Sequence, residues 1–156
     1  MQPGQHIYLD GPFGSFSIDR QPHAKGYVFI AGGIGITPIM SMLRTLKDRR
    51  DQHPLILIYA NNRWEDVTFR EEIESMQEGL NLQVVHVLAD PPEDWQGERG
   101  FITRDILDQY LPKEHQKDVY EIFICGPPPM MDVVENLLPQ IPIPLGDFHS
   151  ERFNLV

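Results

Sequence analysis

A glycine-rich turn follows an apolar segment near residue 32, and its residue types suit the binding of a diphosphate. Tyr27–Ala31 is apolar without alternation, as in a strand that is buried on both faces of a parallel sheet. Gly32, Gly33 and Gly35 follow at once. Glycine lets a phosphate approach the main chain without meeting a Cβ atom. The sequence therefore predicts a diphosphate cradle at this turn.

The residues after the turn predict a helix whose first turn faces the diphosphate. Thr37 is expected to cap a helix that begins at Pro38, since a threonine hydroxyl can accept a bond from an early helical N–H. The unpaired N–H groups and the positive end of the helix dipole then point at the glycines. Pro38 stands where the dinucleotide fingerprint has its third glycine, so a purely structural strand-to-helix turn is the alternative.

Composition narrows the classes of function. The 156 residues suit one domain, and a net charge of −10 argues against nucleic acid as a partner. A single cysteine, Cys125, excludes an internal disulfide and a thiolate-only metal cage. No apolar run approaches the roughly 20 residues that span a bilayer. We expect a cytoplasmic chain without a metal site.

Strand-like and helix-like segments alternate along the chain. The predicted strands are residues 27–31, 55–60, 82–88 and 121–125, with a short β-prone segment at 147–156, and the predicted helices are residues 38–49, 64–77, 103–110 and 129–138. This alternation predicts an α/β fold with a doubly wound, Rossmann-like, parallel sheet of five strands and helices on both faces. Ligands of such sheets bind beyond the carboxyl ends of the strands. Residues 89–100, rich in proline, glycine and charge, are predicted to form a surface loop.

Four stretches occur in the order and spacing of the ferredoxin-NADP reductase superfamily. They are GPFGSF (11–16), AGGIGITPIMSMLR (31–44), IFICGPPPMM (122–131) and HSERF (149–153). The chain resembles the pyridine-nucleotide-binding half of this superfamily. The resemblance implies that residues 1–22, whose residues 3–19 are predicted to form a strand, a turn and a second strand, end a flavin-binding β-barrel domain. Residues 23–156 would form the NAD(P)-binding domain.

The resemblance also implies roles for the residues of the two central motifs. Gly32, Gly33, Gly35, Thr37 and Pro38 would hold the diphosphate and the neighbouring nicotinamide ribose, with Met130 close to that ribose. Cys125, Gly126 and Pro127 would form the loop on which the nicotinamide rests, with the Cys125 thiol beside the carbon that gives up hydride. On its residue type alone, Cys125 could equally be a buried structural cysteine.

Two residues near the C-terminus match the acid and the aromatic residue with which this superfamily faces its flavin. They are Glu151 and Phe153. Without the resemblance, a solvated charge and a core aromatic would be the simpler interpretation. The HSERF ending and the NNRWEDVTFREE segment are most similar to membrane ferric reductases and NADPH oxidase-like proteins.

The choice between NADH and NADPH should be made where the second strand ends, at Asn61, Asn62 and Arg63, because the adenosine ribose lies there in this architecture. An acid at this place favours the 2′-hydroxyl of NADH, whereas arginine can pair with the 2′-phosphate of NADPH. Arg63 is followed by Glu65 and Asp66, with which it could instead pair. The balance leans to NADPH.

The implied reaction is hydride transfer from NAD(P)H to FAD, followed by single electrons to ferric iron, haem or an iron-sulfur protein. The chain lacks the Arg-x-Tyr-Ser type motif with which the family binds FAD, so an upstream flavin domain of the same polypeptide would bind it. The purified chain is therefore expected to be colourless and inactive. A membrane haem domain further upstream would make the chain the cytoplasmic part of a membrane protein. The alternative is a nucleotide-sensing module without electron transfer, against which HSERF argues.

Overall fold

The computed structural model describes residues 6, 10, 14–20, 23–112, 120–141 and 145–153. The strands are β1 (Gly26–Gly32), β2 (Leu55–Asn61), β3 (Leu82–Leu88), β4 (Glu98–Arg99), β5 (Tyr120–Cys125) and β6 (Leu145–Glu151). The helices are α1 (Ile36–Asp48), α2 (Arg70–Met76), α3 (Arg104–Tyr110) and α4 (Pro128–Leu137).

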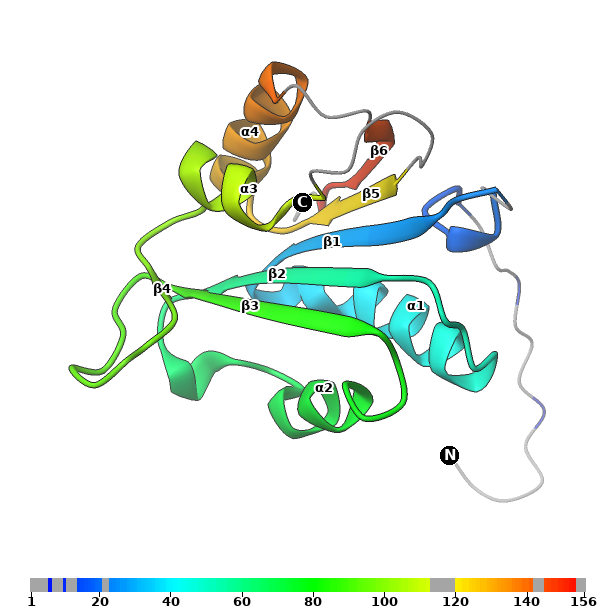
Figure 1. The fold of residues 1–156 in the computed structure, drawn as a ribbon, viewed down its shortest axis with the longest axis horizontal. Coiled ribbons are helices and arrows are strands. Elements are labelled where there is room, and N and C mark those ends of the chain that lie inside the picture. Colours follow the sequence, from blue (N-terminus) through cyan, green and yellow to red (C-terminus); the bar gives the residue numbers. More distant parts are fainter. Residues whose placement is uncertain are drawn as a thin grey trace.

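The six strands form one parallel sheet in the order β4-β3-β2-β1-β5-β6 (Figure 1). The predicted doubly wound α/β class is confirmed. The sheet has six strands where five were predicted, because Glu98 and Arg99 of the predicted surface loop pair with Val87 and Leu88. The C-terminal β-prone segment forms β6, which pairs with β5.

The central strand β1 is buried at every residue and lies between β2 and β5. Phe29 is in register with Leu57 on one side and with Phe123 on the other. A strand covered on both faces needs a continuous apolar run, as found here. The chain leaves β1 toward β2 and later returns to β5 on the opposite side. The loops after β1 and β5 therefore meet at the carboxyl edge, at the topological switch point.

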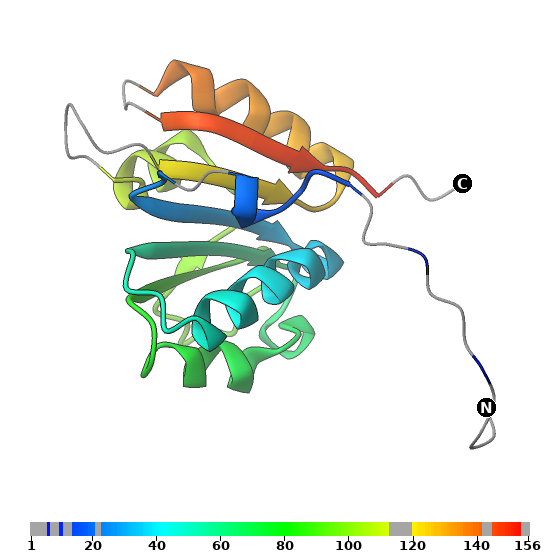
Figure 2. The same cartoon turned by 90° about the vertical axis from the view of Figure 1, so that its right-hand side faces the viewer.

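Helices cover both faces of the sheet (Figures 1 and 2). α1 and α2 pack with Phe29, Tyr59 and Phe123 in one apolar cluster. α3 and α4 pack in a second cluster with the alternate residues of the same strands, such as Ile30 and Ile124. α1 buries apolar side chains at helical spacing, namely Ile36, Ile39, Met40, Met42, Leu43 and Leu46. None of the described residues forms a helix long and apolar enough to cross a membrane.

The predicted helix 64–77 is interrupted, so the prediction was wrong for the residues before Arg70. Residues Trp64–Asp66 form a single 3₁₀ turn, and α2 begins only at Arg70. Phe69 between them has a left-handed backbone with φ of 59°, a conformation that non-glycine residues rarely adopt. Phe69 packs against the α1 side of the core, and the Arg44 guanidinium lies 5.2 Å from its ring centroid. Tertiary packing therefore outweighs the helical pattern of the sequence at this position.

Most of the predicted N-terminal strand–turn–strand unit lies outside the described residues, as do Gly11–Phe13 of the GPFGSF motif. At its end, Ile18–Arg20 forms a 3₁₀ turn instead of a strand. Phe16 contacts the Phe123 ring edge-on, with ring centroids 5.3 Å apart. The last described part of the N-terminal segment thus packs on the α1 face of β5.

Candidate nucleotide-binding site

The glycine turn after β1 is tighter than the sequence predicted. A 3₁₀ turn, Gly33–Gly35, leads directly into α1, which begins at Ile36. Thr37 therefore does not cap the helix, because it lies inside its first turn, and its Oγ1 donates to the Ile34 carbonyl at 3.0 Å. Pro38 is the third helical residue, where a missing N–H still costs no helical hydrogen bond. The first turn of α1 remains at the carboxyl edge of the sheet.

Two of the three glycines serve the packing of the two motifs against each other. A Cβ atom on Gly35 would overlap the carbonyl oxygen of Cys125, and one on Gly32 would lie 2.6 Å from Met130 Sδ and 2.8 Å from Pro127 Cδ. The sequence predicted that these glycines let a phosphate approach the main chain. The structure shows that the atoms nearest to their absent side chains belong to the protein, so the β1 and β5 loops form one interlocked unit.

Gly33 is the glycine that leaves the main chain open to a ligand. Its φ is +49°, and no atom of the described structure lies within 4 Å of the position that its Cβ would take. The Tyr59 hydroxyl donates to the Gly33 carbonyl at 3.2 Å. Burial raises the pKa of Tyr59, which keeps this phenol protonated as a donor. The Tyr59 hydroxyl thus fixes the turn, while the main chain at Gly33 stays accessible, as a diphosphate would require.

Cys125 ends β5, where it is in register with Ala31 of β1 and Glu151 of β6. The residue is fully buried. Burial, together with the nearby charge of Glu151, raises the pKa of the thiol to about 11, so the thiol is neutral at physiological pH. A direct contact between this thiol and a nicotinamide needs the residues that cover it to move. The burial agrees with the structural role that its residue type also allowed.

The C-terminal acid and aromatic lie at the end of β6. Glu151 is partly buried beside Cys125, and Phe153 is 40% exposed two residues further on. Arg152 between them forms ion pairs with Asp132 and Glu135 of α4. The sequence interpretation gave no role to Arg152. A signal was available, since strand alternation places Arg152 on the opposite side of the chain from Glu151 and Phe153.

The last residue of β2 and the two residues after it differ in burial. Asn61 is buried, and its Nδ2 has no hydrogen-bond partner among the described residues, whereas Asn62 and Arg63 are exposed. The Arg63 Nε lies 3.2 Å from Asp90 Oδ2. The Asp90 main chain is fixed at this place, because its N–H donates to the Asn62 carbonyl at 2.7 Å. Arg63 therefore pairs across to the strand-β3 side of the site.

An exposed aromatic residue at the same edge was not found from the sequence. Phe101 is 76% exposed and follows Gly100, whose N–H donates to the Leu88 carbonyl at 2.7 Å. Leu88 is the register partner of Asn61, so Phe101 lies near the carboxyl end of β2. The positive φ of Gly100, 89°, turns the chain here. A glycine followed by an aromatic residue, at the end of the predicted loop, was the available signal.

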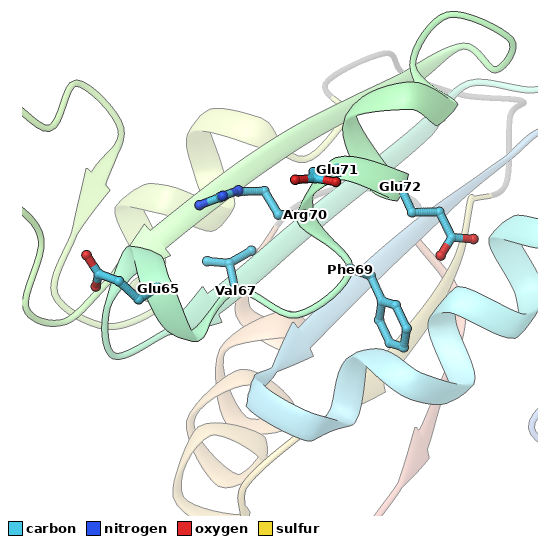
Figure 3. Close-up of a pocket in the computed structure, with 6 residues that line it drawn as sticks. All are labelled: Glu65, Val67, Phe69, Arg70, Glu71 and Glu72. Atoms are coloured by element: carbon cyan, nitrogen blue, oxygen red, sulfur yellow. The ribbon is translucent and has the colours of Figure 1, made fainter.

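A surface hollow of about 560 Å³ lies beside the segment that follows Arg63 (Figure 3). Its lining residues are Glu65, Val67, Phe69, Arg70, Glu71 and Glu72. Three of these are carboxylates, and the Arg70 guanidinium lies 4.9 Å from the Trp64 ring centroid. This excess of negative charge disfavours an anionic ligand, so the hollow is a poor site for phosphate.

Comparisons with known proteins agree with this geometry. A family model described as an oxidoreductase NAD-binding domain matches residues 29–136. NADH-cytochrome b5 reductase 1 of Cryptococcus neoformans var. neoformans serotype D is 35% identical over 151 residues, which cover 90% of this chain and 50% of that protein. NADH-cytochrome b5 reductase 2 of Chaetomium globosum is 33% identical over 137 residues, which cover 86% of this chain and 39% of that protein. The chain thus spans half of these relatives or less.

Among solved structures, the CS-b5R domains of human Ncb5or in the NAD+ form match with a TM-score of 0.74 and 26% identity, over 89% of this chain and 40% of that one. The narrower similarity to membrane ferric reductases stays a prediction. The family match, the interlocked glycine and Cys-Gly-Pro loops and the six-stranded parallel sheet lead to one assignment. The chain belongs to the oxidoreductase NAD-binding domains of the ferredoxin-NADP reductase superfamily.

Proposed function

We propose that this chain is the nucleotide-binding half of a flavin-dependent reductase that uses NADH. When bound, NADH supplies a hydride and FAD accepts it, after which electrons leave singly to a haem or iron-sulfur acceptor. The observation that carries the proposal is the interlocked pair of loops, because it leaves Gly33 as an open approach to the main chain beside the first turn of α1. The relatives named as NADH-cytochrome b5 reductases support it.

The chain's own residues would bind and orient the nucleotide. The Gly33 turn and the first turn of α1, including Thr37 and Pro38, would receive the diphosphate, since early helical N–H groups and the helix dipole favour an anion. Pro127 is exposed and Met130 partly so, and both would line the nicotinamide side together with the Gly126 main chain, whose absent Cβ would meet Met130. The exposed ring of Phe101 offers a flat surface for the adenine.

The residues at the end of β6 would face the flavin. Glu151 lies level with Cys125, and Phe153 follows two residues later; at this carboxyl edge both would exclude water and position the two rings. Cys125 would support the nicotinamide as a neutral thiol once its cover has moved. The proposal also includes a flavin domain, a haem or iron-sulfur electron acceptor and a cytoplasmic location of the assembled protein.

The pairing of Arg63 with Asp90 supports NADH over NADPH, which reverses the leaning of the sequence. The Asp90 carboxylate offsets the positive charge that Arg63 would otherwise offer to a 2′-phosphate. The two side chains are 65% and 75% exposed, so their mutual attraction adds little to folding stability. The charges of Arg63 and Asp90 would still act on a bound 2′-phosphate, even though the ion pair adds little to folding stability.

Calorimetric titration with NADH and NADPH tests the proposal. Gly33→Asn is the informative variant, because asparagine tolerates a left-handed backbone and its side chain would enter the open approach. Gly79→Asn is the matched control, since a Cβ there also meets no atom within 4 Å and the residue precedes β3, at the opposite edge of the sheet. Gly35 is unsuited to this test because its Cβ would clash with the protein itself.

We expect the wild type and Gly79→Asn to bind NADH equally and Gly33→Asn to lose binding at least tenfold, or about 1.4 kcal/mol. Asp90→Asn should narrow the preference for NADH over NADPH by about tenfold, since one repulsive charge is removed. Equal NADH affinity in Gly33→Asn and Gly79→Asn would refute the cradle. A wild type that prefers NADPH would refute the role given to Asp90.

A further inference from the structure

We propose that Arg152 is a positioning residue that fixes the C-terminal end of β6 to helix α4 and thereby keeps Cys125 shielded. Arg152 Nη1 lies 2.8 Å from Asp132 Oδ1, and Nη2 lies 2.5 Å from Glu135 Oε2. One guanidinium thus bridges two carboxylates that are three residues apart on one face of α4. The inference rests on the proposed function only where it concerns Glu151 and Phe153.

The bridge acts at a place where the sheet offers little other restraint. β6 is one of the two edge strands, and among the described residues β5 is its only hydrogen-bonded neighbour strand. Its pairing ends at Glu151, the register partner of Cys125. Figure 2 shows α4 running along β6, on the face of the sheet opposite to α1. Arg152 is the first residue beyond the last strand pair, and its two ion pairs extend the attachment of the chain by one residue.

Alternation along the strand separates the two sides of this segment. His149 contacts the Phe123 ring and the Glu121 carboxylate on the α1 face, where Cys125 also packs. Arg152 reaches α4 on the opposite face. A guanidinium held on the α4 side therefore holds Glu151 on the Cys125 side, because both belong to the same stretch of backbone.

Losing the bridge removes only a small part of the free energy of global unfolding. It removes a much larger share of the free energy that opposes local opening of this segment. Side chains that are one quarter to two thirds exposed form ion pairs of modest strength. Local opening of an edge segment costs far less free energy than global unfolding. A change that is minor for the whole domain can thus change the exposure of Cys125 severalfold.

The rate of thiol labelling measures this opening directly, because Cys125 is the only cysteine of the chain. The full chain is treated with a small disulfide reagent without nucleotide, as wild type, as Arg152→Ala and as the charge swap Arg152→Glu with Glu135→Arg. Arg104→Ala is the control, since Arg104 is also exposed and forms an ion pair with Asp108 within α3. It also donates to the Gln140 carbonyl just after α4, so this control removes a contact at the other end of α4 and leaves the Arg152 bridge in place. Each rate is measured at low and high salt, which screens exposed ion pairs.

We expect Arg152→Ala to be labelled about tenfold faster than the wild type, the charge swap to restore at least half of the protection on a logarithmic scale, and Arg104→Ala to match the wild type. High salt should accelerate labelling of the wild type and leave the rate of Arg152→Ala unchanged. A wild-type rate that ignores salt, or equal rates in Arg152→Ala and Arg104→Ala, would overturn the proposal. The salt measurement needs no variant, so a salt-independent wild-type rate overturns the proposal even where a variant folds poorly.

The same samples separate this inference from the proposed function. Failure of the wild type to bind NADH, with salt-sensitive protection of Cys125, would reject the nucleotide site and leave the Arg152 bridge in place. Normal NADH binding with salt-independent protection would reject the bridge and leave the nucleotide site in place.

Discussion

At the scale of single residues, the same residue type serves different purposes within one motif. Gly32 and Gly35 are glycines because Met130 and the Cys125 carbonyl occupy the space of a side chain, whereas Gly33 is a glycine with a left-handed backbone and open surroundings. The sequence motif shows three equivalent glycines. The distinction depends on the loop after β5, about ninety residues later in the chain, so a local pattern could not reveal it.

Cys125 gives a prediction for alkaline pH. Its thiol pKa is about 11 in the folded chain against 9.0 for an ordinary cysteine. Below pH 9 both states keep the proton, and above it the unfolded chain loses the proton first. Folding stability should therefore fall between pH 9 and 11, by at most about 1.4 kcal/mol per pH unit.

Denaturant unfolding at several pH values, compared between the wild type and Cys125→Ala, measures this contribution. The pKa of buried Tyr27 and Tyr59 is also raised, but both tyrosines are present in both proteins and cancel in the difference. The stability difference between the two proteins should be constant below pH 9 and shrink above it. Parallel curves up to pH 11 would contradict the buried, neutral thiol.

At the scale of elements, strands were predicted better than helix starts. β1, β2, β3 and β5 follow the apolar runs because burial on both faces demands such runs. β4 has two residues, Glu98 and Arg99, and no apolar pattern to reveal it. The break before α2 and the early start of α1 depend on tertiary contacts, with Arg44 at Phe69 and with the Cys125 loop at Gly35. The pairing of Arg63 with Asp90 likewise follows from the neighbouring strands β2 and β3, not from adjacency in sequence.

The left-handed backbone at Phe69 gives a prediction for α2. Phe69→Ala loses the packing of the ring and keeps the backbone strain, whereas Phe69→Gly loses the same packing and relieves about 1 kcal/mol of strain. The glycine variant should therefore be at least as stable as the alanine variant in denaturant unfolding. Ser75 inside α2 is the control, where Ser75→Gly should be less stable than Ser75→Ala by about 1 kcal/mol. The same order at both positions would show that Phe69 is not strained.

At the scale of the whole molecule, the parallel sheet brings together residues from distant parts of the chain. Because β1 lies between β2 and β5, the proposed site would draw on the loops after these three strands and on the end of β6. A ligand bound at this edge would contact elements from nearly the full length of the described chain. A ligand held there should stabilise the domain as one cooperative unit.

Thermal unfolding with NADH tests this coupling. A ligand at one hundred times its Kd adds about 2.7 kcal/mol to the free energy of unfolding when it binds the folded state alone. For a domain of this size, that corresponds to a rise in Tm of roughly 5–10 °C. The rise should occur in one cooperative transition for the wild type and for Gly79→Asn. At the same NADH concentration it should shrink by about half or more in Gly33→Asn, whose affinity is at least tenfold lower and whose Tm without nucleotide serves as its own reference. Two separate transitions, with NADH shifting one of them, would mean that the loops after β1 and β5 do not unfold as the single interlocked unit that Gly32 and Gly35 indicate.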